Sequence, residues 1–301
     1  MKIFKPIFEL VKETLDGWTQ ANGSLMAAAL AYYATFSLAP LLVITISLAG
    51  MIFGEANVTN TILYQISEFM GPEFADSVEN IINSIQRNPT TDITAIISVV
   101  VMVVGASILF VQLKRAINFL WGILPIPGLG FIITIRGHLL SVAWVLLMGM
   151  LLVAVMGVGT MLILMDQYFR NLPEGLQELL PSVNYGMILV IFTIFFALLF
   201  KTLPDAHIKW KDVFLGAFVT AFLFSLGEYF IGYYLSRANL GNAFGAASSF
   251  IFILVWVYYS MQIILIGAKF TQVYANKFGA QIRPSKHTNL FIRRFLDVEE
   301  E

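Results

Sequence analysis

One carboxylate, Glu228, lies well inside an apolar stretch of this sequence. Residues 213–236 form a run long enough to cross a lipid bilayer, and Glu228 is its only acidic side chain. At about 1.5 Å per residue, Glu228 lies roughly 24 Å from the start of the run. An ionised group is costly in hydrocarbon, so such a residue usually faces a cavity or a polar partner. Three interpretations remain open: a substrate pathway, a structural polar contact, or a misplaced span end.

Polar groups in two other apolar runs extend this set of candidates. Pro40 lies within residues 25–54, where it removes a backbone donor and clashes with the preceding turn, so we expect a kink or break between Ser37 and Pro40. A broken helix can present free backbone groups to a substrate, although a simple packing kink fits the same pattern. Tyr229 and Gln262 place further polar side chains inside apolar runs. The candidates for a substrate pathway are therefore Glu228, Ser37, Pro40, Tyr229 and Gln262.

Three basic residues lie at the ends of apolar runs. Lys114 and Arg115 follow residues 93–113, and Lys269 lies near the end of residues 246–274. If the spans pack side by side, these cations form a basic cluster at the inner interface that can bind an anionic lipid head group. Ordinary interfacial cations extend their charged ends toward water in the same way, and this second interpretation is the simpler one.

Catalytic chemistry has little support in the sequence. The three histidines, His138, His207 and His287, are far apart and lack metal-ligand spacing, and there is no cysteine. We find no phosphate-binding loop and no nucleophile motif. The basic residues do not form a stripe with interleaved aromatics, which argues against a nucleic-acid partner. The sequence therefore predicts a protein that is not an enzyme, with no cofactor and no metal.

Six apolar runs must position the candidate residues. The chain of 301 residues is 58% hydrophobic and 12% charged, and soluble domains usually have about twice that charged fraction. Runs of about 20 apolar residues are long enough to span a bilayer as helices. We therefore predict an all-α, polytopic membrane protein, and its six spans are expected at about residues 25–54, 93–113, 137–165, 184–200, 213–236 and 246–274.

The distribution of Lys and Arg predicts the orientation of these spans. Alternate connections and both ends of the chain hold 15 of the 18 basic residues, and the other side holds only Arg87, Arg170 and Arg237. Short cytoplasmic connections retain Lys and Arg. Both termini are therefore expected in the cytoplasm.

Three segments are expected outside the membrane or at its surface. Residues 1–23 contain an amphipathic helix over 4–20, which either lies on the inner leaflet or packs against the bundle. Residues 55–92 follow the first span and predict a helical hairpin over the outer end of the six-span domain, 24–275. Residues 276–301 form a polar, charged cytoplasmic tail.

Motifs near both ends of the membrane domain carry a family resemblance. They are Leu203-Pro204, Lys209-Trp210-Lys211-Asp212, Gly216-Ala217, Phe244-Gly245-Ala246-Ala247, Trp256-Val257-Tyr258-Tyr259-Ser260 and Gly267-Ala268, together with residues 27–40 (AAALAYYATFSLAP). In combination, they resemble the YihY/virulence factor BrkB family of bacterial inner-membrane proteins, formerly mislabelled ribonuclease BN. The resemblance implies six spans with both ends in the cytoplasm. One position departs from the family pattern, which commonly has Glu where this chain has Lys269.

Two functions remain in competition. The resemblance implies transport or export of lipid-linked or other envelope compounds, so the first hypothesis is a transporter or flippase-like permease. Its expected partners are membrane lipids and a small or lipid-linked substrate. The alternative is a non-transporting scaffold or envelope-integrity factor in which the polar groups only hold helices together. We find no inverted repeat relating the two halves of the chain, and this weakens the standard architecture of a secondary transporter.

Overall fold

The computed structural model describes residues 4–70, 75–76, 79, 83, 92–125, 143–144, 146–147, 150–151, 179–237, 248–285 and 288–290. The described helices are α1 (Phe4–Gln20), α2 (Gly23–Phe53), α3 (Glu55–Met70), α5 (Asp92–Leu120), α8 (Leu179–Thr202), α9 (Trp210–Arg237) and α11 (Ser248–Phe278). The described strands are β1 (Ile123–Pro125), β2 (Ala206–His207), β3 (Arg283–Pro284) and β4 (Thr288–Leu290). The predominantly helical class is confirmed, with short strands that the sequence analysis did not anticipate.

Three helices contain segments that are long and apolar enough to cross a membrane. Within the described residues these are Tyr185–Thr202 in α8, Trp210–Gly227 in α9 and Ile253–Phe278 in α11. The predicted first span coincides with the 31-residue α2, and the predicted second span lies within the 29-residue α5. Most of the predicted third span, 137–165, lies outside the described residues. The count of six spans and their orientation therefore stay predictions.

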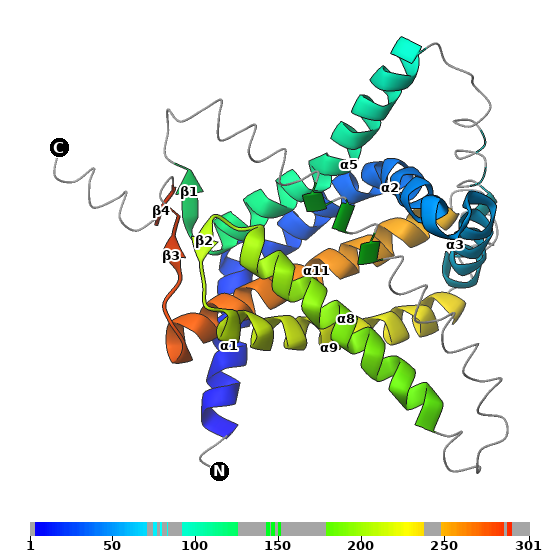
Figure 1. Ribbon diagram of the computed structural model, residues 1–301. Helices are drawn as coiled ribbons and strands as arrows, with labels where there is room; N and C mark the ends of the chain where they lie inside the picture. The colour runs from blue at the N-terminus through cyan, green and yellow to red at the C-terminus, as the bar shows by residue number, and fades with distance from the viewer. Residues whose placement is uncertain are drawn as a thin grey trace.

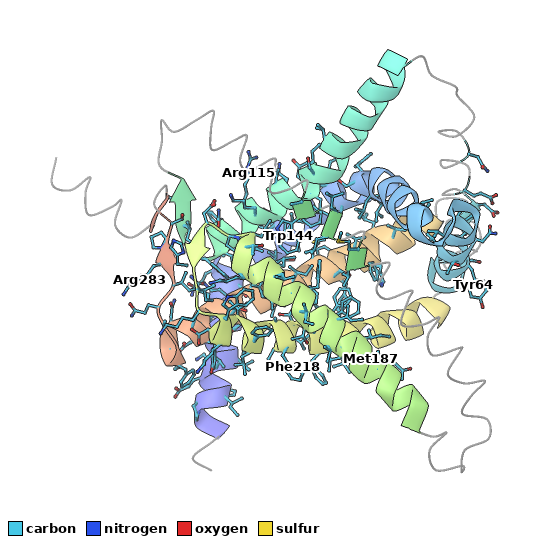
Figure 2. The ribbon with its side chains drawn as sticks, in the orientation of Figure 1. Tyr64, Arg115, Trp144, Met187, Phe218 and Arg283 are labelled. Atoms are coloured by element: carbon cyan, nitrogen blue, oxygen red, sulfur yellow. The ribbon has the colours of Figure 1, made fainter. Side chains whose placement is uncertain are left out.

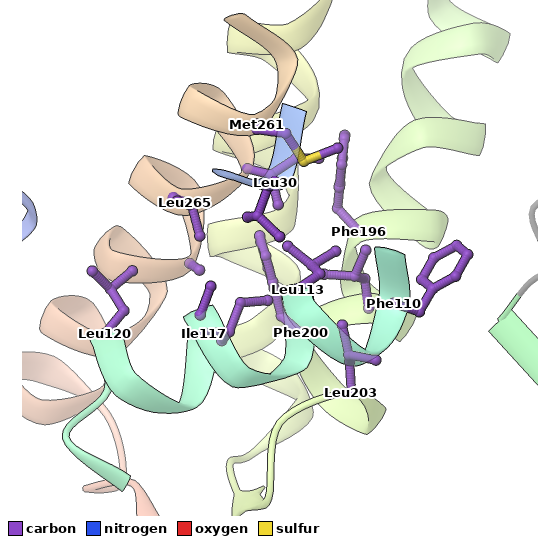
Figure 3. Close-up of a cluster of buried hydrophobic side chains, with 14 of the residues drawn as sticks. Leu30, Phe110, Leu113, Ile117, Leu120, Phe196, Phe200, Leu203, Met261 and Leu265 are labelled. Carbon is purple, nitrogen blue, oxygen red and sulfur yellow. The ribbon is translucent and has the colours of Figure 1, made fainter. Parts of the chain in front are cut away.

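The long helices pack around a continuous apolar core (Figure 1). The main pairs are α8 with α9, α9 with α11, α11 with α2, and α2 with α5. Phe196 and Phe200 of α8 meet Leu113 and Ile117 of α5 at the centre, beside Leu265 of α11 (Figure 3). Lipid is as apolar as these side chains, so close packing, rather than removal from water, supplies much of the attraction.

Helices α9 and α11 approach each other through a reciprocal pair of glycines and threonines. A Cβ atom placed on Gly216 would overlap the side chain of Thr271, and one placed on Gly267 would overlap that of Thr220. Each threonine donates its hydroxyl hydrogen bond to the carbonyl of the glycine one turn earlier on its own helix, at 2.7 Å. This seam, which we call the glycine–threonine seam, is fully buried at both threonines. Small residues at such positions let two helix backbones approach closely in a membrane.

Helix α2 is continuous through Pro40. It runs from Gly23 to Phe53 and ends at Gly54, which adopts the positive φ of 85°. A break near Pro40 is therefore wrong, since the helix assignment is uninterrupted there, and a kink at this position stays a prediction. Within the same helix, Ser37 donates a hydrogen bond of 2.9 Å to the carbonyl oxygen of Gly105 on α5. The hydroxyl thus joins two helices.

Helix α1 turns away from α2 at Asn22, which has the left-handed φ of 55°. Figure 1 draws α1 at a steep angle to α2 and α11, near the end of the bundle that holds the strands. Its buried residues are Leu10 and Thr14, and Lys277 of α11 lies 2.7 Å from the carboxylate of Glu13. Packing against the bundle is therefore confirmed for this face.

The apolar stripe that the sequence predicts on α1 does not lie on the face that packs against the bundle. Four of its members are exposed, namely Ile7, Phe8, Val11 and Leu15. The exposed fraction reaches 70% at Phe8. A helix that packs on the bundle with one face and exposes an apolar stripe on another is suited to the surface of a bilayer. Contact with the inner leaflet stays a prediction.

The C-terminal tail folds back as a strap across two connections. Its strand β3 pairs antiparallel with β2, in the connection between α8 and α9, and β4 pairs antiparallel with β1, which follows α5. The amide of Ser285 also donates to the carbonyl of Asp205, at 3.0 Å. We call residues 283–285 and 288–290 the C-terminal strap. The sequence analysis placed this segment in a polar tail and did not foresee its pairing.

The predicted outer hairpin is described only in part. Its first half is the helix α3, which begins directly after Gly54. Of its second half, only residues 75–76, 79 and 83 belong to the described part of the chain. The hairpin as a whole therefore lies largely outside the described residues.

Candidate functional site

Polar side chains meet between the start of α2 and the middle of α11. The hydroxyls of Ser24 and Tyr258 share a hydrogen bond of 2.7 Å, and the amide nitrogen of Gln262 donates to Ser24 at 3.3 Å. Tyr258 and Gln262 are four residues apart on α11, so they lie on the same face of that helix. We call Ser24, Tyr258 and Gln262, together with Trp18 of α1, the polar cluster.

Two buried atoms of the polar cluster have no hydrogen-bond partner among the described residues. They are Nε1 of Trp18, which is a donor, and Oε1 of Gln262, which is an acceptor. The Trp18 indole lies against Gly23, where an added Cβ atom would overlap the ring. Gly23 directly precedes Ser24, so the side chains of Trp18 and Gln262 contact consecutive residues of α2. An unmet buried group of this kind costs about 1–3 kcal/mol, and in the described part of the chain only these two side-chain atoms are unmet in this way.

Lys269 closes the end of α5. Its Nζ donates to the carbonyl oxygen of Leu120 at 3.2 Å and to Oε1 of Gln272 at 2.7 Å. Gln272 in turn donates to the carbonyl of Trp121 at 2.8 Å. The last carbonyls of a helix lack intrahelical partners and carry partial negative charge, so a cationic donor stabilises them. The side chain of Lys269 also lies against Gly17 of α1, where an added Cβ would overlap its flexible end.

This contact gives Lys269 a structural role at the position where the resemblance implies Glu. A glutamate cannot donate a hydrogen bond to Leu120 when ionised, and its charge would be repelled by the negative end of α5. Lysine donates this hydrogen bond, and its positive charge is attracted by the negative end of α5. The residue that stands out in the sequence thus has a structural partner in α5.

The other two members of the predicted basic cluster, Lys114 and Arg115, do not share the contacts of Lys269. Lys114 forms an ion pair of 2.8 Å with Asp205, whose second carboxylate oxygen accepts from Asn118 at 2.9 Å. Arg115 is exposed. Figure 2 places Arg115 and Arg283 toward the end of the bundle that holds the strands. Two of the three cations therefore contact other residues of the protein, and lipid head-group binding stays a prediction.

Glu228 and Tyr229 belong to α9, and their side chains lie outside the described residues. The residue before them, Gly227, faces α11, since a Cβ atom placed there would overlap the ring and hydroxyl of Tyr259. Of the pathway candidates with described side chains, Ser37 and Gln262, Gln262 joins the polar cluster directly. Ser37 instead contacts α5, as described above.

Sequence reasoning missed Trp18, Ser24 and Asp205 as polar contact residues. A signal for the first two was present, because a tryptophan at the end of an amphipathic helix precedes an Asn-Gly-Ser turn. Asp205 follows Leu203-Pro204 in a short connection, where an acidic side chain is unremarkable. Within the described ranges, no group of three His, Asp or Glu side chains gathers in a way that would hold a metal ion.

These features define a helical membrane protein with several candidate spans. The chain belongs to the Virulence factor BrkB family, whose sequence model matches residues 14–290. This match covers nearly the whole chain and confirms the resemblance found in the sequence motifs.

Relatives of this chain carry the name UPF0761 membrane protein. The protein from Tolumonas auensis is 26% identical over 250 residues, which cover 82% of this chain and 79% of the relative. The protein from Actinobacillus pleuropneumoniae is 25% identical over 281 residues, covering 90% of this chain and 94% of the relative. A longer relative from Alkalilimnicola ehrlichii is 24% identical over 259 residues, which cover 85% of this chain but 56% of that protein. No solved structure matches the chain.

Proposed function

We propose that this chain is a transporter or flippase-like permease for an amphipathic or lipid-linked compound of the bacterial envelope. It acts in the inner (plasma) membrane as a multi-pass protein of six spans, with both termini in the cytoplasm. Membership of a family of membrane proteins supports this proposal, as does the enrichment of Lys and Arg in alternate connections. We propose no catalytic step and no cofactor.

The polar cluster carries the proposal. Most described hydroxyls inside the bundle are satisfied locally, as Thr220 and Thr271 are by their own helices. Others join two helices with their hydrogen bond satisfied, as Ser37 does with Gly105. The polar cluster differs because it leaves one donor and one acceptor unmet, on Trp18 and Gln262. Buried polar groups without a partner are rare in native structures, and a bound ligand is one way to satisfy them.

The two interfaces of α11 suggest how such a pathway is built. Toward α9, the glycine–threonine seam is closely packed, so α9 and α11 behave as one rigid pair. Toward the start of α2, the contact is made by exchangeable hydrogen bonds of Ser24. We propose that the pathway runs between α2 and the α9–α11 pair, with Glu228 and Tyr229 of α9 contributing polar groups to it.

Lipid movement in reconstituted vesicles tests this function. The full chain is placed in liposomes that contain fluorescent lipids with zwitterionic, anionic or glycosyl head groups, and transfer between leaflets is followed by chemical quenching. We expect transfer of at least one lipid above that of protein-free vesicles. Glu228→Gln and Gln262→Met are each expected to lower this transfer about tenfold, the effect of losing one buried hydrogen bond.

Two matched variants control for general effects of the substitutions. Gln281→Met and Glu79→Gln make the same chemical changes at exposed positions and should leave transfer unchanged. If Glu228→Gln transfers lipid at the wild-type rate, Glu228 has no part in the mechanism. If the wild-type protein moves none of the lipids, the scaffold hypothesis is favoured.

A further inference from the structure

We propose that an anionic phospholipid, such as phosphatidylglycerol, binds on the exposed face of α9, with its phosphate against lysines at the junction of α8 and α9. This site lies outside the polar cluster and does not depend on transport. It also differs from the basic cluster that the sequence predicts, because Lys114 forms an ion pair and Lys269 closes the end of α5. The lysines of the proposed site are Lys201, Lys209 and Lys211.

The exposed face of α9 carries a row of large apolar side chains at four-residue spacing. Side chains four residues apart form one inclined ridge on the surface of a helix. This α9 ridge consists of Trp210, Phe214, Phe218, Phe222 and Leu226, and its exposed fractions run from 44% to 53%. The candidate span of α9 begins at Trp210. At about 1.5 Å per residue, the ridge extends about 18 Å from Trp210 to Phe222, comparable with half of a hydrocarbon core of about 30 Å. One acyl chain can therefore lie along it.

Lys201 places a positive charge at the start of the α9 ridge. It lies in the last turn of α8, and its Nζ donates to the carbonyl oxygen of Ile208. The same Nζ lies 5.6 Å from the centre of the Trp210 ring. The ring of Trp210 in turn lies 5.7 Å from that of Phe214, measured between centres. An ammonium group has three donors, so Lys201 keeps donors for a phosphate while it contacts Ile208.

Two exposed lysines flank Trp210 in the chain. Lys209 directly precedes it, and Lys211 directly follows it. Lys211 is three residues before Phe214 on α9, so these two side chains are neighbours on the helix surface. The charged end of the α9 ridge is therefore formed by Lys211 and Lys201, with Lys209 beside them in the chain.

The nearby carboxylates do not neutralise these lysines. Asp205 pairs with Lys114. Asp212 is buried, and its carboxylate accepts a hydrogen bond of 3.1 Å from the amide of Ala280. In the part of the chain that the structure describes, none of the three lysines of the site pairs with a carboxylate. Three unpaired cations attract a lipid with a net negative charge more strongly than a zwitterionic lipid.

The α9 ridge favours a lipid over a soluble anion. A free phosphate would contact the lysines and leave the aromatic side chains in place without a partner. A phospholipid uses both parts, because its phosphate meets the lysines while its acyl chain follows the ridge. Tryptophan at the end of a span is also suited to the level of the lipid head groups.

Lipid titration tests the ligand class. The purified full chain in detergent is titrated with phosphatidylglycerol, phosphatidylethanolamine or phosphatidylcholine of identical acyl chains, and bound lipid is counted by native mass spectrometry. We expect phosphatidylglycerol to bind about tenfold more tightly than the two zwitterionic lipids. Lys209→Gln/Lys211→Gln should weaken its binding about 25-fold, which is about fivefold for each lost charge. Lys209→Arg/Lys211→Arg keeps both charges and should bind like the wild type.

Two controls separate a defined lipid site from other kinds of attraction. Arg115→Gln removes one exposed charge from α5, whose helix partners are α2 and α11, and should leave binding unchanged. A loss equal to that of Lys211→Gln would show diffuse attraction and overturn the inference. Glycerol 3-phosphate, which lacks acyl chains, should not displace the lipid at equal concentration. Displacement would identify a site for a soluble anion. Equal affinity for phosphatidylglycerol and phosphatidylethanolamine would also refute the proposal.

Fluorescence quenching locates the bound lipid while the lysines stay in place. The full chain is placed in phosphatidylcholine vesicles that contain a small fraction of phosphatidylglycerol or phosphatidylethanolamine, brominated on the acyl chains near the head group. We expect stronger quenching by the brominated phosphatidylglycerol, because Trp210 is 45% exposed beside the lysines. This difference should disappear in Trp210→Phe and persist in Trp256→Phe. Equal quenching of the wild-type protein by both lipids would rule out the site.

Discussion

Replacing Gly216 with Ala tests the close approach of α9 and α11. The added Cβ atom would overlap Oγ1 of Thr271 and lie 2.8 Å from its Cβ. A Cβ atom is not the flexible end of a side chain, so the two helices must separate. Overpacking of this kind costs about 1–3 kcal/mol, whereas the gain in helix propensity from Gly to Ala is about 0.5–1 kcal/mol. We therefore expect a net loss of stability of up to about 2.5 kcal/mol.

The matched control is Gly186→Ala in α8. Nothing lies within 4 Å of a Cβ atom at Gly186, so only the propensity gain of about 0.5–1 kcal/mol applies. The two variants should thus differ by about 1–3 kcal/mol. We expect a difference of several degrees in the thermal midpoint, measured by intrinsic tryptophan fluorescence of the full chain in detergent.

A size swap checks that the steric contact is the cause. In the double variant Gly216→Ala/Thr271→Gly, the side chain that would be overlapped is removed, so its stability should exceed the sum of the two single effects. By the reciprocity of the seam, Gly267→Ala should behave like Gly216→Ala, because Thr220 occupies the equivalent position. If Gly216→Ala melts at the same temperature as Gly186→Ala, the reasoning about the seam is refuted.

Two further predictions concern the end of the bundle that holds the strands. Lys269→Met leaves the carbonyl of Leu120 without its cationic donor, and should destabilise the protein by about 1–3 kcal/mol, measured as a lower thermal midpoint. An unchanged midpoint would show that this contact adds no stability. Deletion of residues 283–301 removes the C-terminal strap, and should increase hydrogen exchange at residues 123–125 and 206–207 while the centres of the long helices stay protected. Unchanged exchange at both strands would mean that the strap does not hold these connections.

The extents of the helices followed closely from local sequence patterns. The helix predicted over 4–20 is α1, and the spans predicted at 25–54 and 213–236 correspond to α2 and α9 within three residues at each end. Apolar runs and helical periodicity are properties of neighbouring residues, so no knowledge of the tertiary fold is needed to find them. The predicted second span ended at residue 113, but α5 continues to Leu120.

The extension of α5 has a tertiary cause. Lys114 was taken as the end of the span because a charge is unfavourable in lipid. In the structure, Lys114 pairs with Asp205, and Asn118 also contacts that carboxylate. The continued helix buries Ile117 on its other side. A distant partner thus decides where this helix ends.

The contact partners of the polar residues could not be predicted from neighbouring residues either. Pro40 predicts a kink or a break in α2, and the helix has no break there. Gln262 was identified as a candidate from its position alone, whereas its contact with Ser24 links residues that are 238 positions apart. Lys269 was an anomaly in the sequence, and only the packing of α5 against α11 gives it a role.

By itself, the sequence determined the membrane class, the family and the extents of most described helices, because apolar run length, charge placement and motif identity are all encoded locally. Only the tertiary structure decided how those helices are joined. The glycine–threonine seam, the C-terminal strap and the polar cluster each combine segments that lie far apart in the chain. Such contacts depend on the complementary shapes and hydrogen-bonding groups of packed surfaces. No run of neighbouring residues specifies that complementarity.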